Sequence, residues 1–492
     1  MEDILTTIVI GAGLAGLATA AHLRAAGREV LVVEREDVPG GRAGRLHQDG
    51  FTFDTGPTVL TMIDLVDEVL RAVGSSVEAA LPLQRLDPAY RARYADGSAI
   101  HVRHGHTAMT EEIARTCGAG DAAAFEDFTR WLRRLYEVEM PHFIGRNYDS
   151  PTDLLARPGA ALELVRLGGF GRLGPAIRRR FADDRLHRLF SFQAMYAGLA
   201  PDQALAIYAV ITYMDSIEGV WFPDGGMRAL PQAMADANAQ AGVEFVYGRS
   251  VSRILTRHDG AVMGVELDDG ERIGADAVVT TLDLPVAYAR HAEDLRPPRA
   301  ARTGDYSPSA LVWHLGVRGV PEHAAHHNIH FGRAWKGAFD DLLVGGRRMS
   351  DPSRLVCVPS KDDASAAPEG HSTLYVLEPV PNLHVGEIDW EVETPRMQEE
   401  LLSFLAGEGY PTDVVTDAVV TPVDWQQQGM AAGTPFALAH TFAQTGPFRP
   451  ANHDPRRPGL FFAGSSTVPG VGVPMVLISG RLAARRVSDY LA

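Results

Sequence analysis

The chain is poor in cysteine, carries less positive than negative charge, and has no apolar run suited to a lipid-exposed helix. Its two cysteines, Cys117 and Cys357, are too few and too far apart for a disulfide framework or a zinc site. Lysine and arginine total 46 against 62 acidic residues, a formal net charge of -16 that argues against nucleic acid as a partner. We expect a protein of the reducing cytoplasm.

Two stretches are almost uncharged, and each is considered first as a membrane segment. Residues 4–23 follow two acidic residues instead of a basic region, so we expect no targeting signal there. Residues 458–480 are long enough to span a bilayer, which takes roughly 20 apolar residues. Prolines and glycines in "VPGVGVP" would nevertheless break a lipid-exposed helix. Something other than lipid must cover this C-terminal stretch.

Motifs of metal and acyl-transfer enzymes are missing as well. The 18 histidines show no HExxH or similar metal-ligand spacing, and no GxSxG elbow marks a nucleophilic serine. We assign no metal ligands and look for a different chemistry.

The N-terminal segment "TIVIGAGLAGLATAAHLRAAGREVLVVE" has the pattern of a βαβ unit. A β-branched run at residues 7–10 precedes a glycine turn and a small-residue helix that ends near residue 26. A second apolar run, at residues 30–33, leads to Glu34. A carboxylate at that place accepts hydrogen bonds from ribose hydroxyls and repels a 2′-phosphate, so the unit predicts NAD or FAD binding and disfavours NADP.

Each glycine of the first turn has a physical reason. Gly11 permits the tight turn, Gly13 lets the backbone approach a pyrophosphate, and Gly16 lets the helix pack on the strand. The N-terminus of the helix then offers free N–H groups and the positive end of its dipole to the phosphates.

The residues after the acid separate FAD from NAD. "VPGGRAGRLHQDGFTFDTGPTVL" adds the glycine pair Gly40 and Gly41 with Arg42 directly behind it. Here the sequence resembles the superfamily of FAD-dependent amine oxidases and phytoene desaturases, whose motif after the ribose acid is GGR. The resemblance implies that Arg42 neutralises the FAD pyrophosphate and that residues 56–58 lie near the flavin.

A later segment, "VEFVYGRSVSRILTRHDGAVMGVELDDGERIGADAVVTT", alternates like strands and carries a hairpin signal at Asp269 and Gly270. In the superfamily this segment returns to the FAD domain, and the residue that matches Val251 holds the adenine with its backbone. A purely structural β-meander has the same pattern. The following "TTLDLP" departs from the Asn-Ala-Asp usual in desaturases, which puts contacts from that loop in doubt.

The uncharged C-terminal stretch is interpreted as a flavin cover. "GLFFAG" predicts a short buried strand, and Pro474 suits the first position of a helix. A helix N-terminus aimed at the flavin would stabilise the negative charge of its reduced form by about 0.3–1 kcal/mol. The segment resembles the C-terminal signature of bacterial and fungal phytoene desaturases, from which Val468 and Met475 depart where many members have His and Gly. An ordinary core strand and helix would explain the apolarity but not the glycines.

Together these motifs predict a noncovalent FAD site. Its residues are Gly11, Ala12, Gly13, Leu14, Ala15, Gly16, Glu34, Arg35, Gly40, Gly41, Arg42, Gly56, Pro57, Thr58, Val251, Gly464, Ser465, Pro474, Met475 and Val476.

The expected fold class is α/β: a Rossmann-type FAD-binding domain with an inserted α+β substrate-binding domain and a helical membrane-facing part. The FAD-binding domain is predicted at 1–85, 216–284 and 445–492, and the substrate-binding region at 86–215 and 285–444, with a helical lid around 150–200. Stretches such as "HHNIHFG" and "LYVLEPVPNL" extend the desaturase resemblance over most of the chain. It implies an elongated apolar tunnel that ends at the flavin. An apolar substrate agrees with Tyr208, Tyr213, Met214, Trp221 and Phe222, although side chains of this kind more often belong to an ordinary core than to a tunnel wall.

Residues 154–181 mix leucines with six arginines. A basic amphipathic segment of this type can lie in the headgroup region of an anionic bilayer. The alternative is a helical lid with a solvated basic face. Because a long hydrocarbon substrate resides in the membrane, we expect peripheral attachment to the cytoplasmic membrane.

The resemblance implies desaturation of phytoene, or a closely related acyclic carotenoid, by hydride transfer to the flavin, with a quinone or oxygen as electron acceptor. Asp149 and Asp153 lie where a carboxylate could assist, but their interpretation as solvated loop acids is favoured, and the base is left unassigned. Three alternatives stay open: a ketolase or 3,4-desaturase of the same fold, a flavin amine oxidase, and a non-enzymatic isoprenoid carrier similar to the Rab GDP dissociation inhibitors. An amine oxidase would need an aromatic cage, and a carrier would have lost the flavin motifs.

Overall fold

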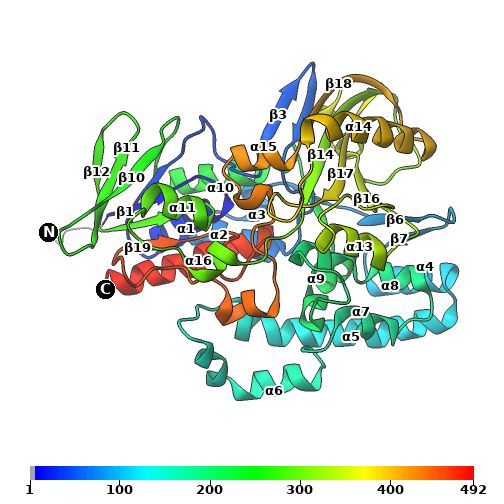
Figure 1. Ribbon diagram of the computed structural model, residues 1–492, viewed down its shortest axis with the longest axis horizontal. Coiled ribbons are helices and arrows are strands. Elements are labelled where there is room, and N and C mark those ends of the chain that lie inside the picture. The colour runs from blue at the N-terminus through cyan, green and yellow to red at the C-terminus, as the bar shows by residue number, and fades with distance from the viewer. Residues whose placement is uncertain (1–5) are drawn as a thin grey trace.

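The computed structural model describes residues 6–492; residues 1–5 of the predicted FAD-binding domain lie outside the described part. In Figure 1 a parallel sheet with its helices lies on the left, a larger sheet lies on the right, and helices α5 (Ala119–Glu139) and α6 (Pro158–Arg166) run along the bottom. The fold is therefore a mixed α/β arrangement, as the sequence predicted.

The parallel sheet collects strands from three distant parts of the chain. Its order is β19-β13-β1-β2-β9, and every neighbouring pair is parallel. The strands are β1 (Thr6–Ile10), β2 (Glu29–Val33), β9 (Glu244–Val246), β13 (Ala277–Thr280) and β19 (Leu460–Phe462). The first and last segments of the described chain thus meet in one sheet, while the precise domain limits stay a prediction.

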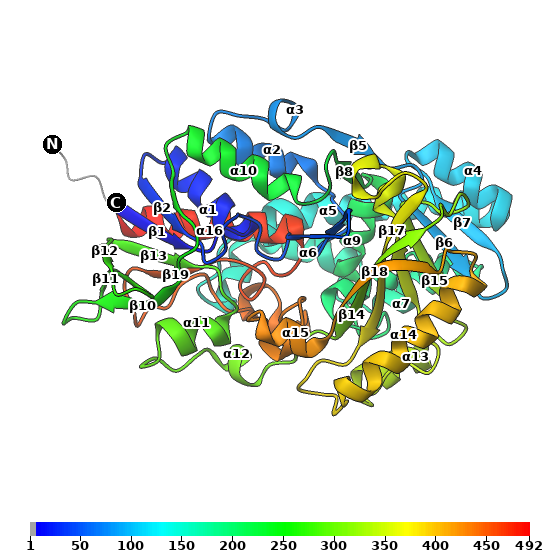
Figure 2. The same cartoon turned by 90° about the horizontal axis from the view of Figure 1, so that it is seen from above.

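Alternate residues of β1 face two different layers, because successive side chains of a strand point to opposite faces. Ile8 and Ile10 pack against the antiparallel sheet formed by β10 (Val251–Thr256), β11 (Val262–Leu267) and β12 (Arg272–Gly274). Val9 packs toward helices α1 (Leu14–Ala25), α10 (Ala229–Gln240) and α16 (Val473–Tyr490). Figure 2 shows α10 above the parallel sheet and β10–β12 below it.

Small residues let α1 and α16 pack closely. Helix α1 is buried on almost all sides, as expected for a helix made mostly of Ala, Gly and Leu. A Cβ at Gly480 of α16 would stand 2.6 Å from the carbonyl oxygen of Ala15. The C-terminal helix therefore lies directly beside the first helix of the nucleotide-binding unit.

The second part contains a seven-stranded sheet of order β18-β14-β17-β16-β15-β6-β7. Its strands are β6 (Tyr90–Tyr94), β7 (Ala99–Val102), β14 (Ser309–Arg318), β15 (His327–Phe331), β16 (Arg354–Cys357), β17 (His371–Val380) and β18 (Asp413–Val420). Helix α14 (Trp390–Gly407) covers one face through Trp390, Met397 and Leu401. The opposite face, with Val312 and Tyr375, turns toward the interior cavity described below.

The remaining elements are short connections and helices around these sheets. The strands are β3 (Arg45–Gln48), β4 (Phe51–Asp54), β5 (Leu83–Arg85) and β8 (Trp221–Pro223). The α-helices are α2 (Ile63–Ala72), α3 (Val77–Ala80), α4 (His106–Thr116), α7 (Leu173–Arg178), α8 (Asp184–Leu189), α9 (Ala209–Thr212), α11 (Leu284–His291), α12 (Arg299–Thr303), α13 (Lys336–Leu343) and α15 (Pro422–Gln427). Short 3-10 helices are η2 (Pro151–Ala156), η3 (Phe192–Ala197), η4 (Ala206–Tyr208), η6 (Pro359–Lys361), η7 (Ala364–Ala366), η8 (Ala431–Gly433), η9 (Phe442–Gln444) and η10 (Gly446–Phe448). The π-helical turns are η1 (Met140–Ile144) and η5 (Tyr213–Ile217).

The basic segment 154–181 is less continuous than its composition indicates. It is divided into η2, α6 and α7, and several of its arginines contact other residues of the chain. Arg178 pairs with Asp202 at 2.8 Å, and the guanidinium of Arg180 lies 3.9 Å from the ring centre of Trp131. Only part of the predicted basic face is thus available to a partner. Within the described residues, no helix is both long and apolar enough to cross a membrane.

Candidate cofactor and substrate site

One cavity of about 1470 Å³ lies between the parallel sheet and the seven-stranded sheet. All the predicted cofactor residues line it except Ala12 and Gly16. A site for one drug-sized ligand measures roughly 300–1,000 Å³, so this cavity has room for a cofactor and a second molecule.

The first glycine turn is fixed by a buried carboxylate. Gly11 has φ of 102°, and a Cβ on Gly16 would meet the Gly11 carbonyl oxygen at 1.9 Å. The amide of Ala12 donates to Oε2 of Glu34 at 2.6 Å, and the amide of Glu36 donates to Oε1 at 3.0 Å. Ala12 and Gly16 therefore shape the turn without lining the cavity. Glu34 holds the turn and also lines the cavity.

The second glycine pair lies against the first turn. The amide of Gly40 donates to the Ala12 carbonyl oxygen at 2.9 Å, and a Cβ on Gly41 would stand 3.2 Å from the Cα of Gly13. Gly41 has φ of 54°, in the left-handed region that favours glycine. Two backbone turns without side chains thus form a concave surface at the N-terminus of α1, which fits a pyrophosphate group.

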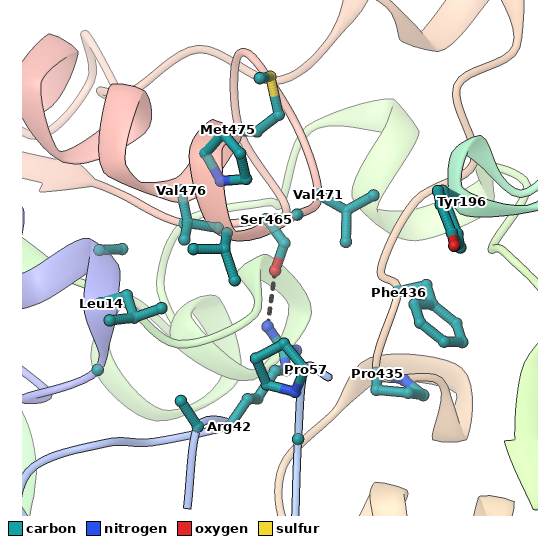
Figure 3. Close-up of a pocket in the computed structure, with 18 of the residues that line it drawn as sticks. Leu14, Arg42, Pro57, Tyr196, Pro435, Phe436, Ser465, Val471, Met475 and Val476 are labelled. Carbon is teal, nitrogen blue, oxygen red and sulfur yellow. Dashed lines mark hydrogen bonds between the residues drawn. The ribbon is translucent and has the colours of Figure 1, made fainter. Parts of the chain in front are cut away.

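Arg42 does not act as an isolated cation in this cavity. It donates to Oγ of Ser465 at 2.6 Å and to both carboxylate oxygens of Asp283 at 3.0 Å. Figure 3 shows Arg42 and Pro57 on one side of the cavity, with Ser465 facing them. The buried Asp283 also accepts from Oγ of Ser466 at 3.0 Å. The loop "TTLDLP", whose contacts were in doubt, therefore contributes the carboxylate that balances Arg42, while Nε of Arg42 is buried and makes no hydrogen bond among the described residues.

The loop before α16 is held by polar side chains that sequence motifs do not mark. Arg449 is buried and donates to the carbonyl oxygens of Ser465 at 2.6 Å and Thr467 at 3.0 Å. Burial lowers the pKa of Arg449 to about 10, so the side chain stays charged at neutral pH. The amide of Gly464 donates to Oγ of Ser479 at 3.0 Å. These bonds fix the backbone that faces the cofactor positions.

Helix α16 begins at Val473, so Pro474 is its second residue and not its first as the sequence predicted. Pro474, Met475 and Val476 nevertheless line the cavity from the first turn of the helix. Figure 3 shows Met475 and Val476 on the same side as Leu14, opposite Tyr196 and Phe436. The N-terminus of a helix carries the positive end of its dipole, so the free N–H groups of this first turn can stabilise negative charge in the cavity.

Val251 lines the same cavity beside Arg249 and Ser250. Its carbonyl oxygen lies 3.3 Å from Nε2 of His291, a buried histidine whose pKa is lowered to about 4 by burial. The ring is therefore neutral near pH 7. The adenine contact of Val251 stays a prediction.

Beyond the cofactor positions the cavity wall is apolar. Ile207, Ile211, Phe331, Leu355 and Leu377 are among the lining side chains. Of the five residues weighed as tunnel or core, Tyr208 and Met214 line the cavity, whereas Tyr213, Trp221 and Phe222 do not. The chamber thus suits an apolar ligand.

Carboxyl groups reach this apolar chamber at two places that sequence motifs did not indicate, Glu139 and Asp215. The acids that were weighed as proton acceptors do not line the cavity. Asp149 is exposed and pairs with Arg486 at 2.7 Å, and Asp153 caps η2 by accepting from the amides of Asp149 and Ser150. The structure therefore agrees with the interpretation of Asp149 and Asp153 as acids of a surface loop.

Comparisons with known proteins agree with this geometry. Residues 14–488 match the family described as flavin containing amine oxidoreductase. The chain is similar to a phytoene dehydrogenase of Streptomyces griseus, with 51% identity over 98% of this chain and 94% of the relative. It is also similar to a zeta-carotene-forming phytoene desaturase of Myxococcus xanthus, with 40% identity over 98% and 94%. Among solved structures, a cyclohexylamine oxidase from Brevibacterium oxydans shares the fold, with a TM-score of 0.60 and 17% identity over 99% of each chain.

Proposed function

The chain belongs to the flavin containing amine oxidoreductases, and we propose that it binds FAD noncovalently and desaturates phytoene or a closely related acyclic carotenoid. The observation that carries this proposal is the single cavity that joins the glycine turns of the cofactor site to a mostly apolar chamber.

The residues divide the work between cofactor and substrate. The turns at Gly11–Gly16 and Gly40–Gly41 hold the pyrophosphate, Glu34 accepts from the ribose, and the α16 N-terminus faces the flavin ring. The bound flavin supplies the hydride-accepting chemistry. The apolar wall positions the polyene and keeps water from the reacting carbons. A quinone or oxygen is the proposed electron acceptor.

The proposed route for substrate leads through the membrane-facing side. Phe170, Phe442 and Phe448 line the cavity, and their side chains are 47%, 58% and 38% exposed. Leu162 and Val165 on α6 are also exposed. Three aromatic rings that reach both the cavity and solvent fit a mouth that opens into the acyl-chain region of a bilayer. We therefore propose peripheral attachment to the cytoplasmic membrane.

Feeding phytoene to the purified protein in liposomes tests the function. We expect a yellow protein whose flavin dissociates on denaturation, together with conversion of phytoene to a more conjugated product. A colourless protein that does not take up FAD would contradict the flavin site. A yellow protein that oxidises amines but leaves phytoene unchanged would contradict the substrate. The products show how many double bonds are introduced.

A further inference from the structure

Asp215 is a carboxylic acid in a cavity wall that needs none to bind a hydrocarbon. Its side chain is 2% exposed and lines the cavity beside Met214. It lies in the π-helical turn η5. Turns of this kind are rare in proteins, and where they occur they are often part of a functional site. Removing a carboxylate from water costs free energy, so its presence in this apolar wall indicates a chemical role.

Neutral donors hold the carboxyl group of Asp215. Oγ of Ser216 donates to Oδ1 at 2.7 Å, and Nε2 of Gln193 lies 3.4 Å from both oxygens. Among the described residues, no lysine or arginine forms an ion pair with it. Burial raises the pKa of Asp215 to about 7, while these hydrogen bonds oppose the rise. The group can therefore exchange a proton near neutral pH.

The titratable side chains around Asp215 are tyrosines. Tyr90 on β6 and Tyr196 on η3 both have pKa values raised by burial and by the charge of Asp215, so both stay neutral. The hydroxyl of Tyr90 is buried and lies close enough to Asp215 to help lower the pKa of that carboxyl group, against the effect of burial. Tyr196 lines the cavity opposite the α16 loop in Figure 3.

A chain of contacts connects this acid to the cofactor segment. The ring of Tyr90 lies 5.5 Å from the ring of His327, centre to centre. Nε2 of His327 lies 2.9 Å from the carbonyl oxygen of Thr58, a predicted flavin neighbour. Asp215 is thus linked, through Tyr90 and His327, to the segment of Thr58, which lines the same cavity.

Glu139, the other carboxyl group in the chamber, lacks this support. Its Oε1 is buried without a hydrogen bond in the part of the chain that is described. Burial alone raises its pKa well above the ordinary value, with no donor to oppose the shift. Burial thus favours the protonated form of Glu139, whereas Asp215 has donors that stabilise its charged form.

We propose that the carboxylate of Asp215 accepts the proton that the polyene loses when the new double bond forms. The inference rests on the proposed function. A bound flavin would accept one hydrogen of the substrate as hydride, with the electron pair of its C–H bond, and so take up two electrons. The adjacent C–H bond breaks toward Asp215: its electron pair becomes the π bond, and the proton converts the carboxylate to an acid. Asp215 is reset when it releases the proton, after a quinone or oxygen has reoxidised the flavin.

The test is anaerobic single-turnover reduction of the flavin by phytoene in liposomes, followed by flavin absorbance. For Asp215→Asn we expect a rate about 10²- to 10⁴-fold lower, the usual contribution of a general base. The wild-type rate should rise with pH through about 7 and then level off, and this dependence should be absent in Asp215→Asn. Asp121→Asn is the matched control, a buried aspartate on α5 that does not line the cavity.

Ser216→Ala tests the same proposal while keeping the carboxyl group. Loss of the 2.7 Å hydrogen bond should move the pH profile to higher pH, because the charged form loses a donor. A carboxylic-acid infrared band that titrates with the same midpoint in the wild type, and is missing in Asp215→Asn, is a readout independent of turnover. Equal rates in the wild type and Asp215→Asn, or an unmoved profile in Ser216→Ala, would overturn the proposal. If the wild type itself failed to desaturate phytoene, the proposed function would fail instead.

Discussion

Arg42 and Asp283 are 241 positions apart in the chain, yet the guanidinium donates to both carboxylate oxygens at 3.0 Å inside the cofactor cavity. The Arg42 side chain is 34% exposed and that of Asp283 only 2%. The carboxylate also accepts from the amide of Ala431 at 3.0 Å and from Ser466. The pair therefore ties the GGR motif to the loop after β13 and holds Arg42 in one orientation.

Removing one partner of this pair should cost more than removing both. Arg42→Met leaves a buried carboxylate without its cation, which costs about 3–5 kcal/mol for a fully buried pair and less here because Arg42 is partly exposed. The double variant Arg42→Met/Asp283→Asn should recover most of that stability in urea unfolding. The double variant should nevertheless bind FAD more weakly than the wild type in a fluorescence titration, because it lacks the cation of Arg42. If the stability lost in the double variant equalled the sum of the losses in the two single variants, Arg42 and Asp283 would not be energetically coupled.

Helix α1 lies so close to the turn after β1 that position 16 has no room for a side chain. A Cβ there would lie 1.9 Å from a backbone oxygen, so Gly16→Ala must displace the glycine turn. We expect loss of FAD binding and a lower melting temperature. Gly120→Ala on α5 is the control, because nothing lies within 4 Å of its Cβ position and alanine favours a helix by about 1 kcal/mol. If both variants bound FAD like the wild type, the packing argument would be wrong.

Glu139 should make the protein less stable as the pH rises. Its pKa in the folded protein lies well above its ordinary 4.5, so above that pH the unfolded chain binds fewer protons than the native state. Stability then falls with increasing pH until the folded-state pKa is reached. Glu139→Gln removes the titration, so its stability relative to the wild type should increase with pH, by roughly 1.4 kcal/mol for each pH unit between the unfolded and folded pKa values. Melting temperatures between about pH 5 and 8 provide the measurement, and parallel curves for the two proteins would refute the assignment.

The exposed rings at the cavity mouth should govern membrane binding. Phe442→Ser/Phe448→Ser removes two apolar side chains from the proposed bilayer contact and should reduce flotation with anionic liposomes by about tenfold or more, since burying a Phe contributes roughly 1.5–3 kcal/mol. Val415→Ser is the control, because Val415 is an exposed apolar residue of β18, and that strand lies at the opposite side of Figure 1 from α6. Wild-type protein found only in the unbound fraction would count against peripheral attachment.

The sequence predicted the nucleotide-binding unit because its signals are local. The glycine spacing, the strand before it and the acid after it all lie within 34 residues, and backbone geometry leaves few alternatives for such a pattern. The start of α16 was missed by one residue, which is within the usual variation of helix ends. Arg449 and Asp283 could not be identified in this way, because each acts through partners that are remote in sequence.

By itself, the sequence predicted a flavin cofactor and that its early and late glycine segments would face it, and both segments line one cavity. Only the tertiary structure decided which charges balance in the cavity, which arginines of 154–181 are already engaged, and which acids reach the apolar chamber. The physical reason is that phosphate-binding turns are set by local backbone geometry. The charge state of a carboxyl group such as Asp215 instead depends on burial and on donors that folding brings together.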